Sequence, residues 1–167
     1  MHTISSELIK VGIVDDNKST VSSLQEVLSY APKIKVVLTA KSGDDLFEKL
    51  KFADTEGLPD IIITDVNMPG MSGIEVVRQG KALYPSIRFM MLTVFDDNKN
   101  VFQAISSGAN GYILKKTPPG KLLEYIAEAQ SGGAPMTSSI ATQVLKMFSS
   151  MNNEKGEDYN LSDREKQ

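Results

Sequence analysis

Three carboxylates at the ends of apolar segments are the residues in this chain most able to do chemistry. Asp65 follows the largely apolar run 60–64, and Asp15 and Asp16 follow the apolar run 10–14. Carboxylates at adjacent strand ends repel one another unless a cation lies among them. Hard oxygen ligands at an open site suit Mg²⁺, which keeps several waters and binds through a few carboxylates together with phosphate. The pattern therefore predicts a site that receives a phosphoryl group on a carboxylate rather than one that cleaves a substrate.

Two further polar residues also stand at the ends of apolar runs. Thr93 closes the run 87–93, and Lys115 follows the run 111–114. Taken singly, the threonine has an ordinary explanation as a β-branched strand residue, and the lysine as a solvated surface residue. In an open α/β sheet, however, ligands bind beyond the carboxyl ends of the strands. Acid, hydroxyl and ammonium groups from four strand ends would meet there, so we interpret them as one site.

The spacing of apolar residues predicts the elements that would hold this site. Strands are expected at 10–14, 34–39, 60–64, 87–93 and 111–114. Amphipathic helices are expected between and after them, at 18–30, 43–53, 73–83, 98–107 and 118–131. This alternation predicts an α/β protein with a doubly wound, five-stranded parallel sheet and helices on both faces. The strands are continuously apolar, as expected when both faces of a sheet are covered.

Capping residues mark the expected ends of several helices. Ser72 and Glu75 have the spacing of a capping box. Ser42 and Thr117 are predicted to cap the second and fifth helices. Gly108 is predicted to end the fourth helix, because glycine adopts the left-handed conformation there at no steric cost.

The bulk properties exclude several classes of protein. A chain of 167 residues fits one domain plus an appendage. There is no cysteine, which excludes disulfide, zinc–thiolate and thiol chemistry. The net charge of −3 gives no sign of nucleic-acid binding, and no apolar run approaches the roughly 18 residues of a membrane span. We therefore expect a cytoplasmic protein that does not insert into a membrane.

Four motifs resemble those of one protein family in their order and spacing. They are Val14-Asp15-Asp16, Asp65-Val66-Asn67-Met68-Pro69-Gly70-Met71-Ser72-Gly73, Leu92-Thr93 and Gly111-Tyr112-Ile113-Leu114-Lys115. Over residues 8–131 the chain resembles the receiver domain of a two-component response regulator. The resemblance implies a flavodoxin-like strand order 2-1-3-4-5 and a signalling role, with a sensor histidine kinase as the phosphoryl donor. It also implies that the chain is not an enzyme.

The resemblance assigns the phosphoacceptor and the metal ligands. Asp65 would accept the phosphoryl group. Asp15, Asp16 and Asp65 would hold Mg²⁺ together with the backbone carbonyl of Asn67.

The resemblance also assigns the residues that would respond to phosphorylation. Thr93 would bond a phosphoryl oxygen, Lys115 would pair with the phosphate, and Tyr112 would turn inward behind Thr93. The plain alternative for Tyr112 is an aromatic residue packed on the sheet. Two positions depart from the usual pattern. Lys116 stands where many receivers have a proline after a cis bond, and Phe95 would either shield the acyl phosphate or belong to the core.

The rest of the chain is predicted to be an appendage to this domain. Residues 132–160 are expected to form a linker with one helix at 138–151, and 161–167 resemble the start of a helix-turn-helix domain of the NarL/FixJ (LuxR-type) branch. This resemblance implies a transcription regulator that binds DNA only through that domain, which is truncated here. We expect a homodimer to be favoured by phosphorylation, and no sequence-specific DNA binding by these 167 residues alone.

Two other interpretations use the same residues. A phosphatase of the haloacid dehalogenase type also has a strand-end aspartate and Mg²⁺, but it needs a second acid two residues further on. Asn67 occupies that position, which argues against general acid–base turnover. A receiver-like interaction module that is never phosphorylated usually lacks one of the acids or the lysine, and none is missing here.

Overall fold

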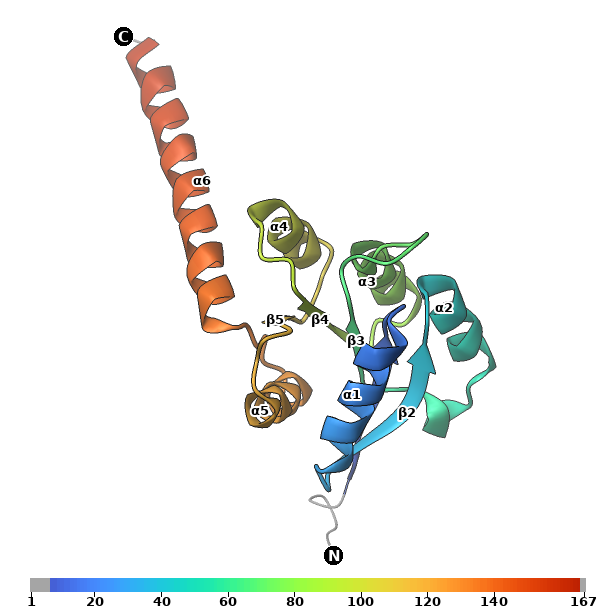
Figure 1. Cartoon of the computed structure of the whole chain (residues 1–167). Helices are drawn as coiled ribbons and strands as arrows, with labels where there is room; N and C mark the ends of the chain where they lie inside the picture. Colours follow the sequence, from blue (N-terminus) through green and yellow to red (C-terminus); the bar gives the residue numbers. More distant parts are fainter. Residues whose placement is uncertain (1–6, 166–167) are drawn as a thin grey trace, which may run out of the picture.

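The computed structural model describes residues 7–165, with side chains up to Met151, and its centre is one parallel sheet (Figure 1). The strands are β1 (Ile9–Val14), β2 (Ile34–Ala40), β3 (Ile61–Thr64), β4 (Arg88–Thr93) and β5 (Gly111–Leu114). The helices are α1 (Lys18–Ser29), α2 (Gly43–Phe52), α3 (Gly73–Leu83), α4 (Asn98–Ser106), α5 (Pro119–Gln130) and α6 (Ser138–Glu165). A short 3₁₀ turn, η2 (Thr55–Gly57), precedes β3.

The strand order is β2-β1-β3-β4-β5, and all neighbouring strands are parallel. This confirms the predicted fold class and order. Val14 pairs with Thr64, and Thr93 pairs with Leu114. β4 runs two residues past the end of β3, because Thr64 pairs with Met91 and β4 ends at Thr93. All five strands are parallel, so the residues that follow them emerge along the same edge of the sheet.

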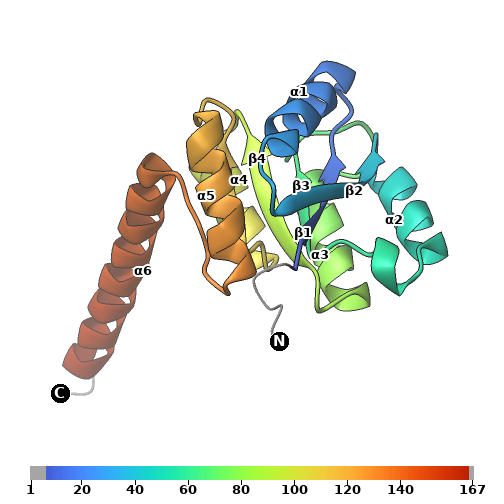
Figure 2. The ribbon, with the colours of Figure 1, turned by 90° about the horizontal axis from the view of Figure 1, so that it is seen from below.

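The two faces of the sheet carry separate apolar clusters, and alternate residues of each strand supply them. Ile61 and Ile63 join the cluster that includes Leu28 of α1 and Ile126 of α5. Ile62 joins the other cluster, which also contains residues of α2, α3, α4 and α6. Figure 2 shows α1 and α5 together on one side of the strands, with α3 on the other. Both faces are therefore covered, which explains the continuously apolar strands.

The helix caps agree with the sequence at three of four positions. Ser42 accepts a hydrogen bond from the Asp45 amide, and Ser72 accepts one from the Glu75 amide. Gly108, with φ +103°, lies directly after the last residues of α4 as predicted. The capping box is only half formed, because the Glu75 carboxylate pairs with Arg78 instead.

The prediction that Thr117 caps α5 is wrong. The residue that precedes α5 is Pro118, and it makes no side-chain capping bond. A proline fixes its own φ near the helical value, so the helix begins one residue later without a hydroxyl cap.

The last helix is longer than the sequence predicted. The expected helix ended at residue 151, whereas α6 runs without interruption from Ser138 to Glu165. No proline stands between these residues, so no residue type forbids a continuous helix there. Figure 1 shows α6 reaching far beyond the body of the molecule. Among the residues that the structure describes, no helix combines the length and apolarity needed to cross a lipid bilayer.

Candidate phosphoacceptor site

Two acids and one lysine meet at the carboxyl edge of the sheet. Lys115 Nζ lies 2.8 Å from Asp65 Oδ2 and 3.1 Å from Asp15 Oδ2. Asp15 is 5% exposed and Asp65 is 9% exposed, while the Lys115 side chain keeps 23% of its surface open to solvent. The three residues come from the ends of β1, β3 and β5, as the sequence predicted. They form a nearly buried site with one ammonium between two carboxylates.

Backbone amides hold the second oxygen of each carboxylate. Asp15 Oδ1 accepts a hydrogen bond of 2.9 Å from the amide of Asn17, the residue that caps α1. Asp65 Oδ1 accepts one of 2.7 Å from the amide of Val66. Each carboxylate is therefore fixed by its own turn on one side and by Lys115 on the other.

A close approach between backbones sets the position of Asp65. A Cβ atom added to Gly73, the first residue of α3, would lie 1.8 Å from the carbonyl oxygen of Asp65. The Gly73 amide also donates to the Val66 carbonyl at 2.7 Å. Only glycine permits this contact, which holds α3 against the turn that carries Asp65.

The electrostatics of the site favour a charged lysine. Burial disfavours the ammonium form of Lys115, but its hydrogen bonds to Asp65 and Asp15 outweigh that cost and raise the pKa of Lys115. One ammonium lies between two carboxylate groups, and such a site can accept a further cation.

The donor set fits a Mg²⁺ ion at this edge. No group of three or more acidic or histidine side chains that could hold a metal is present within the described part of the chain. Mg²⁺ does not require such a closed cage, because one or two carboxylates plus waters and phosphate oxygens satisfy it. Asp15 and Asp65 supply two convergent carboxylates. Asp16 and Asn67 are exposed residues, Asp16 directly after Asp15 and Asn67 two positions after Asp65. The ion pairs with Lys115 are made by Asp15 and Asp65, and not by Asp16.

Thr93 and Tyr112 both form hydrogen bonds with the backbone of Phe95. The Thr93 hydroxyl oxygen accepts a hydrogen bond of 3.2 Å from the Phe95 amide. The Tyr112 hydroxyl donates one of 2.6 Å to the Phe95 carbonyl oxygen. Burial, with further contributions from nearby acids such as Asp97, raises the pKa of the Tyr112 phenol. The turn after β4 is therefore pinned by both residues that the sequence marked as responsive.

The sequence analysis gave two interpretations each for Tyr112 and Phe95. The Tyr112 side chain is fully buried and belongs to the apolar cluster that also contains Ile140 of α6, as expected for an aromatic residue packed on the sheet. Phe95 packs against the apolar cluster, as one of its two interpretations required. The described residues contain no cis peptide bond, so the link between Lys115 and Lys116 is trans.

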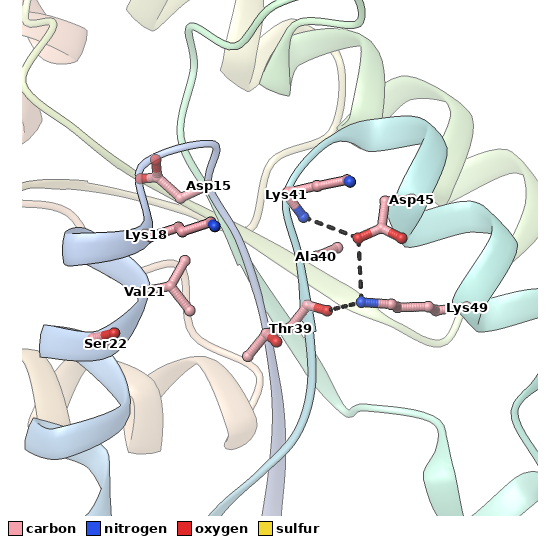
Figure 3. Close-up of a pocket in the computed structure, with 9 residues that line it drawn as sticks. All are labelled: Asp15, Lys18, Val21, Ser22, Thr39, Ala40, Lys41, Asp45 and Lys49. Carbon is pink, nitrogen blue, oxygen red and sulfur yellow. Dashed lines mark hydrogen bonds and ion pairs between the residues drawn. The ribbon is translucent and has the colours of Figure 1, made fainter.

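A hollow of about 300 Å³ lies on the other side of Asp15, between α1 and α2 (Figure 3). Lys18 and Lys41 contribute cationic groups to its lining. Lys49 donates to the Thr39 carbonyl at 2.7 Å and pairs with Asp45 at 3.2 Å. Burial opposes ionisation of Asp45, but hydrogen bonds from the Lys41 amide and the Lys49 ammonium outweigh it and lower its pKa. The lining therefore holds three lysines and two carboxylates, Asp15 and Asp45.

The strand order and the site at the carboxyl edge of the sheet define a doubly wound, flavodoxin-like domain. The chain matches the family described as "Response regulator receiver domain" over residues 11–127, and it belongs to that family. It is 30% identical over 138 residues to the transcriptional regulatory protein LnrK of Bacillus subtilis, a match that covers 83% of this chain and 61% of LnrK. The chain spans only 61–63% of the length of the curated relatives that it matches first.

Solved structures agree with this assignment. The signal receiver domain of the putative response regulator NarL from Mycobacterium tuberculosis is 26% identical, with a TM-score of 0.69 over 75% of this chain and 98% of that domain. A LuxR-family two-component response regulator from Aurantimonas has a TM-score of 0.77 over 84% of this chain and 98% of its own, and at 23% identity it supports the fold alone. Family membership favours the receiver interpretation over a phosphatase of the haloacid dehalogenase type.

Sequence reasoning missed two contributors that the structure reveals. The Phe95 backbone bonds to both Thr93 and Tyr112, and Gln143 of α6 contacts the end of the same turn. The Phe95 bonds use backbone groups, which every residue has, so no residue type in the sequence could have indicated them. Gln143 stands between Ile140 and Val144 on the helix that the sequence predicted, and its position beside two inward residues was the available signal.

Proposed function

We propose that this receiver is switched by phosphorylation of Asp65, with a sensor histidine kinase as the donor. The observation that supports it best is the pairing of Lys115 with both Asp65 and Asp15 at one buried edge of the sheet. A carboxylate held beside an ammonium and a second acid has the charges needed to receive a phosphoryl group beside a metal ion.

The transfer forms one bond and breaks one. An oxygen of Asp65 bonds to phosphorus as the bond between phosphorus and the donor breaks, and the donor leaves with that electron pair. Lys115 stays protonated throughout and stabilises charge on the phosphoryl oxygens. Lys18 and Lys41 line the neighbouring hollow, and their charges would favour the approach of an anionic donor.

Mg²⁺ would be held by the carboxylates of Asp15 and Asp65, by Asp16 and by the backbone carbonyl of Asn67. When bound, it would neutralise charge on the transferred group. Asp16 needs only a local change in its side chain to contribute, because it follows Asp15 directly and is exposed.

The phosphoryl group would then be read by Thr93 and Tyr112. The Thr93 hydroxyl would bond to a phosphoryl oxygen, and the buried Tyr112 would fix the turn behind it. The altered surface would favour a homodimer and control a DNA-binding effector. The relative LnrK is described as a transcriptional regulatory protein, which supports a role in transcription for the whole protein. Sedimentation with and without beryllofluoride tests the dimer.

Intact mass after incubation with acetyl phosphate tests the central proposal. We expect one added phosphoryl group in the presence of Mg²⁺ and none after chelation, with Asp65 as the modified residue. Asp65→Asn should abolish the labelling, whereas Asp44→Asn, a change at an exposed acid of α2, should not. Equal labelling of Asp65→Asn, or steady hydrolysis of a phosphomonoester, would contradict the proposal.

A further inference from the structure

The first turns of α6 are built into the core of the receiver. Ile140 is fully buried and Val144 is 9% exposed. Both belong to the same apolar cluster as Tyr112 and Val101 of α4. The base of α6 is therefore part of the domain, whereas the rest of the helix extends away from it (Figure 1).

The segment just before α6 is bonded to the open edge of β5. The Tyr112 amide donates to the Pro135 carbonyl at 3.0 Å, and the Thr137 amide donates to the Tyr112 carbonyl at 3.2 Å. The Thr137 hydroxyl also accepts a hydrogen bond of 2.9 Å from the Leu114 amide. Met136 forms a parallel bridge with Tyr112. The start of α6 is thus fixed to the strand that carries Tyr112.

Gln143 fixes α6 to a second place, the start of α4. Its side-chain amide donates to the Asp96 carbonyl at 2.7 Å and to Asn98 Oδ1 at 2.5 Å. Asn98 is the first residue of α4, and Asp96 lies in the turn that joins Thr93 to that helix. One side chain therefore links α6 to the segment that follows Thr93.

That short turn is held by three separate bonds. The Phe95 amide donates to Thr93, the Phe95 carbonyl accepts from Tyr112, and the Asp96 carbonyl accepts from Gln143. Thr93 itself is fully buried at the end of β4. A change at the Thr93 hydroxyl acts first on Phe95, whose amide is bonded to it, and then on Asp96, the residue after Phe95.

We infer that Gln143 is a positioning residue that couples α6 to the phosphoacceptor site through residues 94–97. This inference rests on the proposed function. Gln143 and Tyr112 hold the same turn, residues 94–97, and the Thr93 hydroxyl would act on that turn when it bonds to a phosphoryl group. Coupling between two sites is reciprocal, so a phosphoryl group at Asp65 would tighten the hold on α6, and loss of that hold would weaken binding at Asp65.

Beryllofluoride affinity, measured by fluorine NMR in the presence of Mg²⁺, provides the first test. Gln143→Ala should weaken binding about fivefold, a typical size for coupling between sites. Gln143→Glu should weaken it at least as much, because a carboxylate would face the Asp96 carbonyl oxygen. Gln103→Ala, at an exposed position of α4, is the matched control and should bind like the natural chain.

A distance measurement provides the second test. The chain has no cysteine, so spin labels at Ser86→Cys and Ser149→Cys would report only the position of α6 relative to the body. Beryllofluoride should narrow the distance distribution in the otherwise natural chain, and Gln143→Ala should abolish the narrowing.

The outcomes separate this inference from the proposed function. Failure of the natural chain to bind beryllofluoride would contradict the proposed function. Normal binding with unchanged or tighter affinity in both Gln143 variants would overturn the coupling alone. A lower urea midpoint with unchanged beryllofluoride affinity would show that Gln143 only stabilises the fold. That result would also overturn the coupling.

Discussion

Lys115 donates a hydrogen bond of 2.8 Å to Asp65, although 50 residues separate them in the chain. The same ammonium lies 3.1 Å from Asp15, 100 residues away. Three strand ends therefore depend on one side chain for their charge balance.

Removal of the ammonium should destabilise the fold. Lys115→Met would leave two nearly buried carboxylates facing each other without a counter-charge, and we expect a loss of about 3 kcal/mol at neutral pH. Urea unfolding followed by circular dichroism measures it. Lys116→Met, at the exposed neighbouring position, is the control and should stay within about 0.5 kcal/mol of the natural chain. Equal midpoints for the two variants would contradict the role given to Lys115.

Mg²⁺ should stabilise the folded chain, because the unfolded chain has no arranged carboxylates to bind it. At a concentration 100-fold above the dissociation constant the gain should be about 2.7 kcal/mol. Asp15→Asn should remove most of this gain and Asp16→Asn part of it, while Asp44→Asn should leave it intact. Thermal unfolding with Mg²⁺ against Na⁺ of equal ionic strength measures the gain. An undiminished gain in Asp15→Asn would exclude Asp15 as a ligand.

Thr93→Ala should separate phosphorylation from its conformational response. The variant keeps Asp65, Asp15 and Lys115, so acetyl phosphate should still label it. It lacks the hydroxyl that bonds to the Phe95 amide, so the turn at 94–97 should no longer respond. Amide NMR spectra with and without beryllofluoride would show this, with Thr142→Ala on the exposed face of α6 as the control. Identical spectral changes in Thr93→Ala and the natural chain would refute it.

Stability should fall as the solution becomes strongly alkaline. The pKa of Lys115 is raised above its usual 10.5, and the pKa of Tyr112 is raised above its usual 10.0. Above these values the unfolded chain loses protons that the folded chain retains, so the free energy of unfolding decreases with pH. The contribution of each group is fully present below its unfolded pKa and is lost as the pH rises through its folded pKa.

Variants of the phenol test this dependence. Tyr112→Phe should lose about 1 kcal/mol at neutral pH, because its hydrogen bond to the Phe95 carbonyl is removed. It should also show a shallower decrease in stability above pH 10.0. Tyr30→Phe, at a side chain that is 75% exposed, should keep the full slope. Urea unfolding across the alkaline range provides the measurement, and an unchanged slope in Tyr112→Phe would count against the prediction.

A methyl group at Gly73 should disturb the phosphoacceptor turn. Its Cβ atom would meet the Asp65 carbonyl oxygen, so Gly73→Ala should cost about 3 kcal/mol and reduce phosphorylation. Gly120 of α5 has open space at the same position, and Gly120→Ala should stabilise the chain by roughly 0.5–1 kcal/mol. Urea midpoints of the two variants should therefore move in opposite directions.

Much of the fold could be predicted from local features of the sequence. The five strands are continuous apolar runs and the helices carry apolar faces, so their approximate bounds follow from periodicity. Helix ends were less secure. Pro118, and not Thr117, directly precedes α5, and α6 continues past residue 151. Small differences in local geometry decide where a helix begins and ends.

By itself the sequence determined which residues stand at the strand ends, and the parallel arrangement of the strands made their convergence at one edge predictable. Asp15, Asp65, Thr93 and Lys115 all belong to that set. Only the tertiary structure decided which hydrogen bonds and ion pairs these residues form. Lys115 bridges two acids while Asp16 stays exposed, and the Phe95 backbone joins Thr93 to Tyr112. The contact of Gln143 with the same turn depends on how α6 packs against α4, and packing across distant segments leaves no periodic pattern in the chain.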